Sequence, residues 1–144
     1  MSTIHASAVL VGARAVLIRG PSGSGKSSLA LALIQSNALR FTRLVGDDRV
    51  HLEAANGRLL VRPAGTLAGL IEVRGLGIRR VPFEPVAAVG FVVDLAATGA
   101  ERLPARESNA TELAGIALPR LGVAPGADAF ALLIAALRTA ESGH

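Results

Sequence analysis

A glycine-rich run early in the chain has the residue types and the spacing of a phosphate-binding loop. Residues 20–27 read Gly-Pro-Ser-Gly-Ser-Gly-Lys-Ser and match the pattern G-x-x-x-x-G-K-[ST] in full. In such a loop the glycines let backbone N–H groups turn toward phosphate oxygens, and the helix that follows adds the positive end of its dipole. The pattern predicts that Lys26 contacts the outer phosphates and that the Ser27 hydroxyl binds Mg²⁺.

The single lysine of the chain supports this interpretation. The 15 basic residues are 14 arginines and Lys26, so the only lysine stands at the one position where the pattern requires it. This placement favours a nucleotide or pyrophosphate site over a plain glycine-rich turn. The residues expected to bind the phosphates are Gly20, Pro21, Ser22, Gly23, Ser24, Gly25, Lys26, Ser27 and Ser28.

Two adjacent carboxylates form the second element that could do chemistry. The chain has four aspartates, and Asp47 and Asp48 follow directly on a short apolar run. Neighbouring side chains at the end of a strand point to opposite sides. One carboxylate can therefore hold Mg²⁺ while the other accepts the proton of an alcohol that receives a phosphoryl group.

Positioning these groups requires a scaffold of many strands and few helices. Helices are expected at Lys26–Gln35 and at residues 127–140, and a polar loop is expected over residues 98–111. The expected strands cover residues 6–11, 15–19, 44–45, 49–53, 58–62, 70–73, 78–81, 86–95 and 116–123, the last interrupted by Pro119. Two helices are too few for the crossovers of a doubly wound sheet, so we expect a strand-rich α/β fold.

Length and composition exclude several classes of protein. The 144 residues fit one domain, and a chain that is 51% hydrophobic and 18% charged is not disordered. The absence of cysteine excludes disulfides, thiolate metal sites and a cysteine nucleophile. Few aromatic residues and scattered arginines make a nucleic-acid partner unexpected. Neither a targeting leader nor an apolar run of membrane-spanning length is present, so we expect a soluble, cytoplasmic protein with no membrane partner.

Three stretches together resemble the C-terminal catalytic domain of HPr kinase/phosphorylase. They are the phosphate loop, residues 44–50 (Leu-Val-Gly-Asp-Asp-Arg-Val) and residues 70–78 (Leu-Ile-Glu-Val-Arg-Gly-Leu-Gly-Ile), the last holding the specific signature E-[IV]-R-G-x-G. The resemblance extends from about His5 to the C-terminal helix. It implies a short form made of the catalytic domain alone, over residues 1–144. It also implies a strand-rich P-loop fold of the HPr kinase and phosphoenolpyruvate carboxykinase type.

The resemblance implies a serine kinase of the phosphotransferase system. Its substrate would be an HPr-type phosphocarrier protein, its donor ATP or pyrophosphate, and its metal Mg²⁺. Of the family's two acids, one serves as base in transfer and as acid in the reverse reaction. We assign Asp48 to the base and Asp47 to the metal side.

Further site residues follow from the resemblance alone. Glu72 matches the signature glutamate that helps to bind Mg²⁺. His5 resembles a histidine that the family places at the active site, although Ala6 follows it here instead of glycine. Arg102 resembles a catalytic arginine, which would neutralise charge on the transferring phosphoryl group.

A late loop departs from the family pattern. Residues 123–128 read Val-Ala-Pro-Gly-Ala-Asp, where the family usually has Val-Arg-Pro-Gly-Arg-Asn. Both arginines are lost and an acid, Asp128, is gained. Because the family uses this loop in dephosphorylation, we expect weak or absent phosphorylase activity beside an intact kinase activity.

Two other functions stay open from the residues alone. A non-enzymatic nucleotide sensor would need the phosphate loop but no base, so the adjacent aspartates disfavour it. A small-molecule P-loop kinase would share the loop, but the signature over residues 70–78 disfavours that class. The resemblance further implies a homo-oligomer, hexameric in the family, to which the apolar C-terminal helix could contribute if it is not ordinary core.

Overall fold

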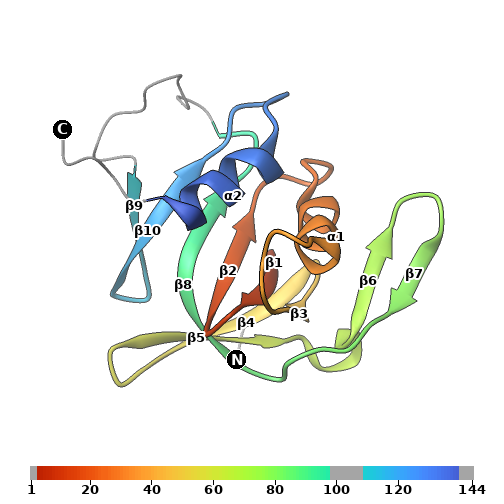
Figure 1. The fold of residues 1–144 in the computed structure, drawn as a ribbon. Helices are drawn as coiled ribbons and strands as arrows, with labels where there is room; N and C mark the ends of the chain where they lie inside the picture. Colours follow the sequence, from red (N-terminus) through yellow and green to blue (C-terminus); the bar gives the residue numbers. More distant parts are fainter. Residues whose placement is uncertain (1–2, 98–108, 140–144) are drawn as a thin grey trace.

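A ring of five strands lies at the centre of the fold (Figure 1). The computed structural model describes residues 3–97 and 109–139. Around the ring each strand pairs with the next, in the order β1, β2, β8, β5, β4 and back to β1. The five strands are β1 (Thr3–Val11), β2 (Arg14–Arg19), β8 (Ala87–Asp94), β5 (Arg58–Pro63) and β4 (Arg49–Ala55).

The remaining strands extend the ring or stand beside it. β3 (Thr42–Gly46) pairs with the second half of β1, and β10 (Ile116–Gly122) runs parallel to the end of β8. The order of the parallel strands at this edge is β2, β8, β10, and their carboxyl ends lie together where the phosphate loop begins. The short strand β9 (Ala110–Leu113) pairs with β10.

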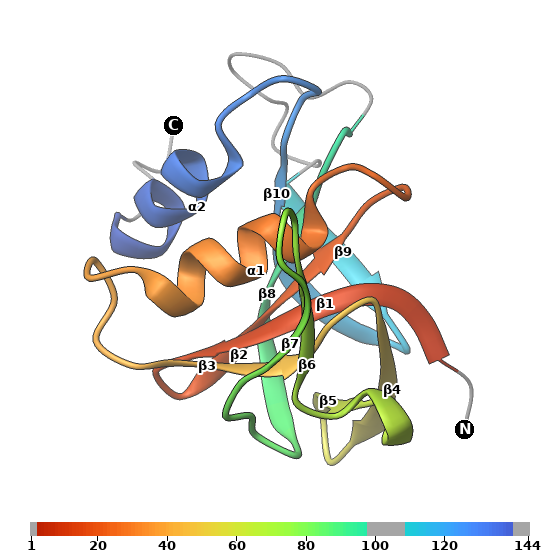
Figure 2. The same ribbon diagram turned by 90° about the vertical axis from the view of Figure 1, so that its right-hand side faces the viewer.

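Alternating side chains divide the apolar residues into two cores. On β2, Val16 and Ile18 face a core shared with the helices, and Ala15 and Leu17 face the inside of the ring. The helices α1 (Lys26–Gln35) and α2 (Ala129–Arg138) lie together over the first core, as Figure 2 shows. Their buried contacts are Leu29, Ala30 and Leu33 from α1 and Leu133 from α2. Within the described residues, no helix is long and apolar enough to span a membrane.

The strands β6 (Leu70–Val73) and β7 (Gly77–Arg80) form a separate two-stranded hairpin that projects from the ring (Figures 1 and 2). A short 3₁₀ turn over Gly65–Leu67 leads into it. At its base the N–H of Val81 donates to the carbonyl of Gly69 over 2.8 Å, which joins the two ends of the excursion. One face packs on α1 through Ile71 and Val73.

Most expected elements are present, β1 and β3 being longer than expected, and three further differences concern the C-terminal part. Residues 110–111, expected to be loop, belong to β9, and the rest of that expected loop, residues 98–108, lies outside the described residues. Pro119 does not interrupt β10. It pairs with Ala110 at the point where β10 changes partner from β9 to β8, so its missing N–H costs no ladder bond to β8. Helix α2 begins two residues later than expected, after Asp128 caps its first turn.

Candidate active site

Backbone geometry at the phosphate loop explains the glycines at its two ends. Gly25 has φ +101°, a left-handed conformation that disfavours side chains, and it is the cap from which α1 begins. A Cβ on Gly20 would lie 2.5 Å from Ser24 Oγ and 3.1 Å from Leu95 Cβ. The loop is thus closely fitted between the ends of β2 and β8, and the free N–H groups of the first turn of α1 lie beside it.

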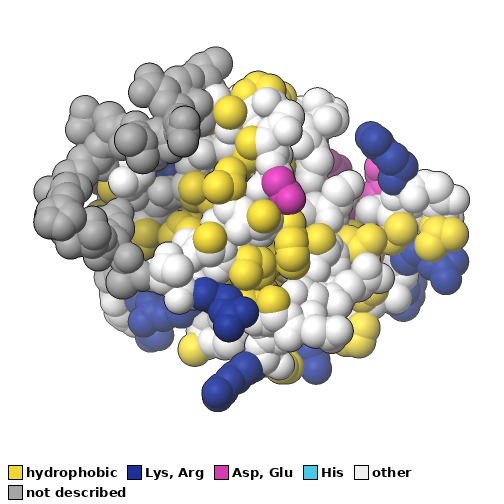
Figure 3. All heavy atoms as spheres, turned by 45° about the horizontal axis from the view of Figure 1, so that its top comes forward, with side chains coloured by type: hydrophobic (Ala, Val, Ile, Leu, Met, Phe, Trp, Pro, Cys, Tyr) yellow, Lys and Arg dark blue, Asp and Glu magenta, His cyan; other side chains and the backbone are white. Residues whose placement is uncertain are grey.

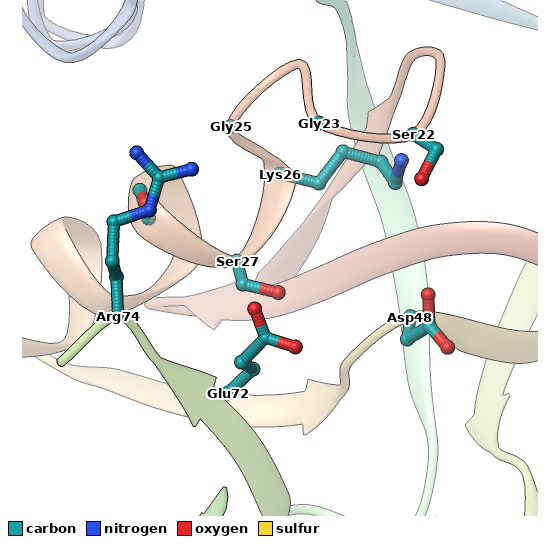
Figure 4. Close-up of a pocket in the computed structure, with 9 residues that line it drawn as sticks. Ser22, Gly23, Gly25, Lys26, Ser27, Asp48, Glu72 and Arg74 are labelled. Atoms are coloured by element: carbon teal, nitrogen blue, oxygen red, sulfur yellow. The ribbon is translucent and has the colours of Figure 1, made fainter. Parts of the chain in front are cut away.

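The loop holds polar groups that a phosphate could satisfy. Lys26 Nζ donates to the carbonyls of Gly20 over 2.8 Å and of Pro21 over 3.2 Å, so its side chain is folded back across the loop (Figure 4). The Ser24 hydroxyl is buried and has no hydrogen-bond partner in the described part of the chain. A spare hydroxyl and a lysine held near the loop suit the binding of phosphate oxygens.

Asp47 is the buried centre of a hydrogen-bond network. Only 5% of it is exposed, and its carboxylate accepts from the hydroxyl of Ser7 over 2.6 Å. The Ser27 hydroxyl lies 2.8 and 2.9 Å from its two oxygens, and the backbone N–H of Glu72 donates to it over 3.1 Å. One carboxylate therefore joins β1, the phosphate loop and the hairpin.

Asp48 differs from Asp47 in its backbone conformation and in its exposure to solvent. Its φ is +69°, and the N–H of Arg49 donates to the carbonyl of Asp47 over 2.8 Å, which makes a tight turn centred on Asp48. Asp and Asn tolerate this left-handed conformation better than most residues. The turn exposes the Asp48 side chain, whereas its neighbour stays buried.

Two cavities meet at the acids. The first, of about 140 Å³, is lined by the phosphate loop together with Asp48, Glu72 and Arg74. Figure 4 shows the carboxylates of Asp48 and Glu72 across this cavity from the loop, with Ser27 pointing toward them. The second cavity, of about 250 Å³, is also lined by Ser27, Asp48 and Glu72, together with Asp47. It extends away from the loop along the hairpin. The geometry therefore offers a phosphate side and a second side, with Asp48 between them.

The oxygen groups beside the loop suit Mg²⁺. The hydroxyl of Ser27 can donate to Asp47 and still offer a lone pair to a cation, and Glu72 adds a carboxylate to the same cavity. Within residues 3–97 and 109–139, no three His, Cys, Asp or Glu side chains are gathered as a complete metal site. Mg²⁺ is usually held by one or two carboxylates and completes its shell with substrate phosphates and water.

The structure separates the other expected site residues. His5 lies on the face of β1 that carries Ser7, and it pairs with Arg49 of the neighbouring strand β4. Its side chain is exposed and lines neither of the two cavities. Arg102 lies outside the described residues. Ser28, at the start of α1, lines the first cavity as expected for the loop.

Ser7 was not expected from the sequence. It is fully buried, and besides its bond to Asp47 it lies 3.4 Å from the backbone N of Asp48, a long hydrogen bond. The available signal was a hydroxyl within the otherwise apolar run of residues 6–11, where a buried polar group needs a partner. That partner is 40 residues away in the chain, so local patterns could not identify it.

A charged cluster fixes the strand ends from which the loop departs. Asp94 accepts from Arg19 Nε over 2.7 Å and Arg19 Nη2 over 2.9 Å, and from Arg120 Nε over 2.5 Å. Burial alone would raise the pKa of the Asp94 carboxyl, but the hydrogen bonds and charges of Arg19 and Arg120 outweigh it and hold the pKa below the ordinary 3.8. The cluster joins β2, β8 and β10 directly beside the first glycine of the loop.

The variant Asp94→Asn should reveal this contribution through its pH dependence. At pH 7 we expect the variant to be less stable by about 2 kcal/mol, because two guanidinium groups lose their charged partner. Because the folded pKa is lowered, the stabilisation is present above about pH 4 and is lost as the pH falls through the folded pKa. Urea unfolding of both proteins at pH 7 and pH 3 measures this. An equal difference at the two pH values would contradict the account.

Comparisons with known proteins agree on one family. The family model described as HPr Serine kinase C-terminal domain matches residues 1–139. An HPr kinase/phosphorylase from Mycoplasma mycoides is 39% identical over 89 residues, which cover 62% of this chain and 26% of that protein. An HPr kinase/phosphorylase from Clostridium tetani is 46% identical over 67 residues, which cover 46% of this chain and 21% of that protein.

A solved structure extends the agreement to the whole fold. The Hpr(Ser) kinase/phosphatase from Coxiella burnetii superposes with a TM-score of 0.75 and 26% sequence identity, covering 96% of this chain and 95% of that chain. The chain spans about a quarter of the length of the curated relatives that it matches. The strand-rich α/β architecture expected from the sequence is thereby confirmed.

Proposed function

The chain belongs to the family of HPr serine kinase C-terminal domains, and from this premise we propose that it is an ATP-dependent serine kinase acting on an HPr-type phosphocarrier. We propose further that its fold is the P-loop variant of the HPr kinase and phosphoenolpyruvate carboxykinase type. The observation that carries the proposal is the position of Asp48, exposed at the border between the phosphate-loop cavity and a second cavity. A nucleotide sensor has no need of a carboxylate there.

The chain's own groups suit phosphoryl transfer to an alcohol. The loop N–H groups and Lys26 would hold the phosphates of the donor, and Asp48 would accept the proton of the substrate serine. The bond from the terminal phosphorus to the leaving ADP breaks as the bond to the serine oxygen forms. Ser27, Asp47 and Glu72 would hold Mg²⁺, which neutralises charge on the donor phosphates when it is bound.

A labelling experiment tests the proposal. The protein is incubated with Mg²⁺ and ATP labelled at the γ-phosphate, together with purified HPr carrier or with a pool of small metabolites. We expect label on a serine of the carrier. Label on a metabolite would instead indicate a small-molecule kinase, and nucleotide binding without any transfer would indicate a sensor. Labelled pyrophosphate in place of ATP identifies the preferred donor.

Weak or absent phosphorylase activity is the second part of the proposal. In the late loop, the acid that replaces the usual asparagine has a structural use, because Asp128 accepts from the N–H of Ala131 over 3.0 Å and caps α2. The loop has no arginine to bind an incoming phosphate. The test uses serine-phosphorylated carrier and inorganic phosphate, and abundant pyrophosphate formation would contradict it.

Chemical labelling of Lys26 should report nucleotide occupancy. It is the only lysine, so an amine reagent is expected to modify Lys26 and otherwise only the α-amino group. MgATP at a concentration well above its Kd should reduce modification of Lys26 at least about tenfold, because the ammonium group then contacts phosphate. Peptide mass spectrometry with the N-terminus as internal reference measures this. Equal modification with and without MgATP would show that the loop does not hold the phosphates.

Assembly and location stay predictions. The resemblance implies a homo-oligomer, hexameric in the family, and the sequence predicts a cytoplasmic protein without nucleic-acid or membrane partners. Helix α2 packs on α1 through the fully buried Leu133, so that side of the helix is core. Leu132, which is 42% exposed, is the large apolar side chain of the described part of this helix that lies most open to an interface. Light scattering of the purified protein measures the oligomeric state.

A further inference from the structure

The second cavity beside Asp48 has an apolar wall that nucleotide binding does not use. Its apolar lining consists of Leu67, Leu70, Ile71 and Ile78, from the 3₁₀ turn and the hairpin. Its volume of about 250 Å³ is below the range of about 300–1,000 Å³ typical of pockets for whole small molecules. The cavity is thus of a size for one or two side chains.

The polar border of this cavity coincides with the reacting groups. Ser27, Asp48 and Glu72 line both cavities, so the second cavity begins where the phosphate side ends. A serine that gives its proton to Asp48 must lie at this border. The residues that flank such a serine in its own chain would then lie over the apolar wall.

The register of the hairpin explains why apolar and acidic groups lie together there. Glu72 on β6 pairs directly with Ile78 on β7, so both side chains are on the same face. The other two residues of β6, Ile71 and Val73, pack against the helix core, and Ile71 also borders the cavity from that side. Ile78 is 63% exposed in this chain, and an exposed aliphatic side chain at the mouth of a reacting site is suited to a partner.

Charge on the hairpin indicates the character of that partner. Arg74, Arg79 and Arg80 stand against a single acid, Glu72, and none of the three arginines forms an ion pair with a described acid. Figure 3 shows the projecting lobe on the right with apolar and basic side chains next to each other. A segment that combines aliphatic and acidic or neutral residues matches this surface.

We infer that the second cavity is the acceptor subsite, and that it receives an aliphatic side chain adjacent to the target serine of the protein substrate, with Ile78 as its main contact. The inference rests on the proposed kinase function and deepens it. It assigns recognition of the serine's neighbours to the hairpin. It also predicts that Ile78 affects binding of the carrier and not of the nucleotide, although Glu72 on the same hairpin lines the phosphate side.

A matched pair of variants on the hairpin tests the inference. Leu76 and Ile78 are two residues apart and are 68% and 63% exposed, but only Ile78 lines the cavity. Ile78→Asp should lower kcat/KM for the HPr carrier about 10- to 100-fold, mainly through KM, because an aliphatic contact is replaced by a charge. Leu76→Asp should stay within about twofold of the parent protein, and Ile78→Val should retain most activity. The KM for ATP and the melting temperature of each variant are measured beside these values.

The outcomes separate this inference from the proposed function. If the parent protein transfers phosphate to the carrier but both aspartate variants lose activity equally, or neither does, the acceptor subsite is wrong and the kinase function stands. A rise in the KM for ATP in Ile78→Asp alone would also overturn the inference. If the parent protein binds MgATP but labels no carrier, the proposed function fails and the inference fails with it.

Discussion

Replacing Asp48 by asparagine is expected to reduce phosphoryl transfer about a hundred- to ten-thousandfold while nucleotide binding persists. The change removes the group that would accept the serine proton, and general-base catalysis contributes about 10²- to 10⁴-fold. Asparagine preserves the shape of the side chain and tolerates the φ of +69° at this position. Single-turnover transfer from labelled ATP to the carrier, with calorimetry for MgATP binding, measures the two effects separately.

The backbone conformation of Asp48 supplies the control for this variant. Asp48→Ala also removes the carboxylate, but it places in the left-handed region a residue that adopts it less readily. Both variants should lose transfer, and the alanine variant alone should lose stability in addition. If Asp48→Asn folds normally but no longer binds MgATP, the carboxylate retains metal or nucleotide and is not the base.

The same substitution one residue earlier should have a different result. Asp47→Asn is expected to abolish transfer and also to lower the free energy of unfolding by about 2–4 kcal/mol. The carboxylate of Asp47 is buried and accepts from Ser7, Ser27 and the N–H of Glu72. An amide has one acceptor oxygen and two donors, so at least one of these buried donors loses its partner.

Comparison of Asp47→Asn with Asp48→Asn separates the effect of the buried hydrogen-bond network from the effect of replacing a carboxylate by an amide. Each replaces a carboxylate by an amide, so a difference in urea unfolding reports the network around Asp47. Ser7→Ala provides a further check, because it removes one of the donors and leaves the carboxylate in place. Equal stability of Asp47→Asn and Asp48→Asn would show that the network contributes little to folding.

The phosphate site was predictable because its information is local. The loop, the glycine at φ +101° and the helix that starts at Lys26 follow from eight consecutive residues. The strand pairs around the short turns were predictable for the same reason. The position of Glu72 beside the loop depended on the family signature, since no local pattern places residues 20–27 next to the hairpin.

Features that depend on contacts between distant residues could not be predicted from local sequence. The sequence shows two adjacent aspartates, but the turn at Asp48 and the pairing of Asp47 with Ser7 decide which one is buried. From the sequence alone, Pro119 predicts a break in the strand. The change of strand partner that accommodates this proline is visible only in the folded sheet. Asp94 and Arg120 gave no signal, since their cluster exists only once β8 and β10 are neighbours.

The narrow base of the hairpin would make the proposed acceptor recognition separable from the phosphate site. The two strands of the hairpin are closed at their base, where Val81 donates to Gly69, and a Cβ on Gly69 would lie 2.9 Å from Phe83. The tip and outer strand of the hairpin can change in length or sequence without altering the ring, provided that Ile71 and Val73 still cover α1 and Glu72 stays beside Asp47. If the proposal holds, exchange of the outer strand of the hairpin would change the preferred acceptor while the phosphate site is kept.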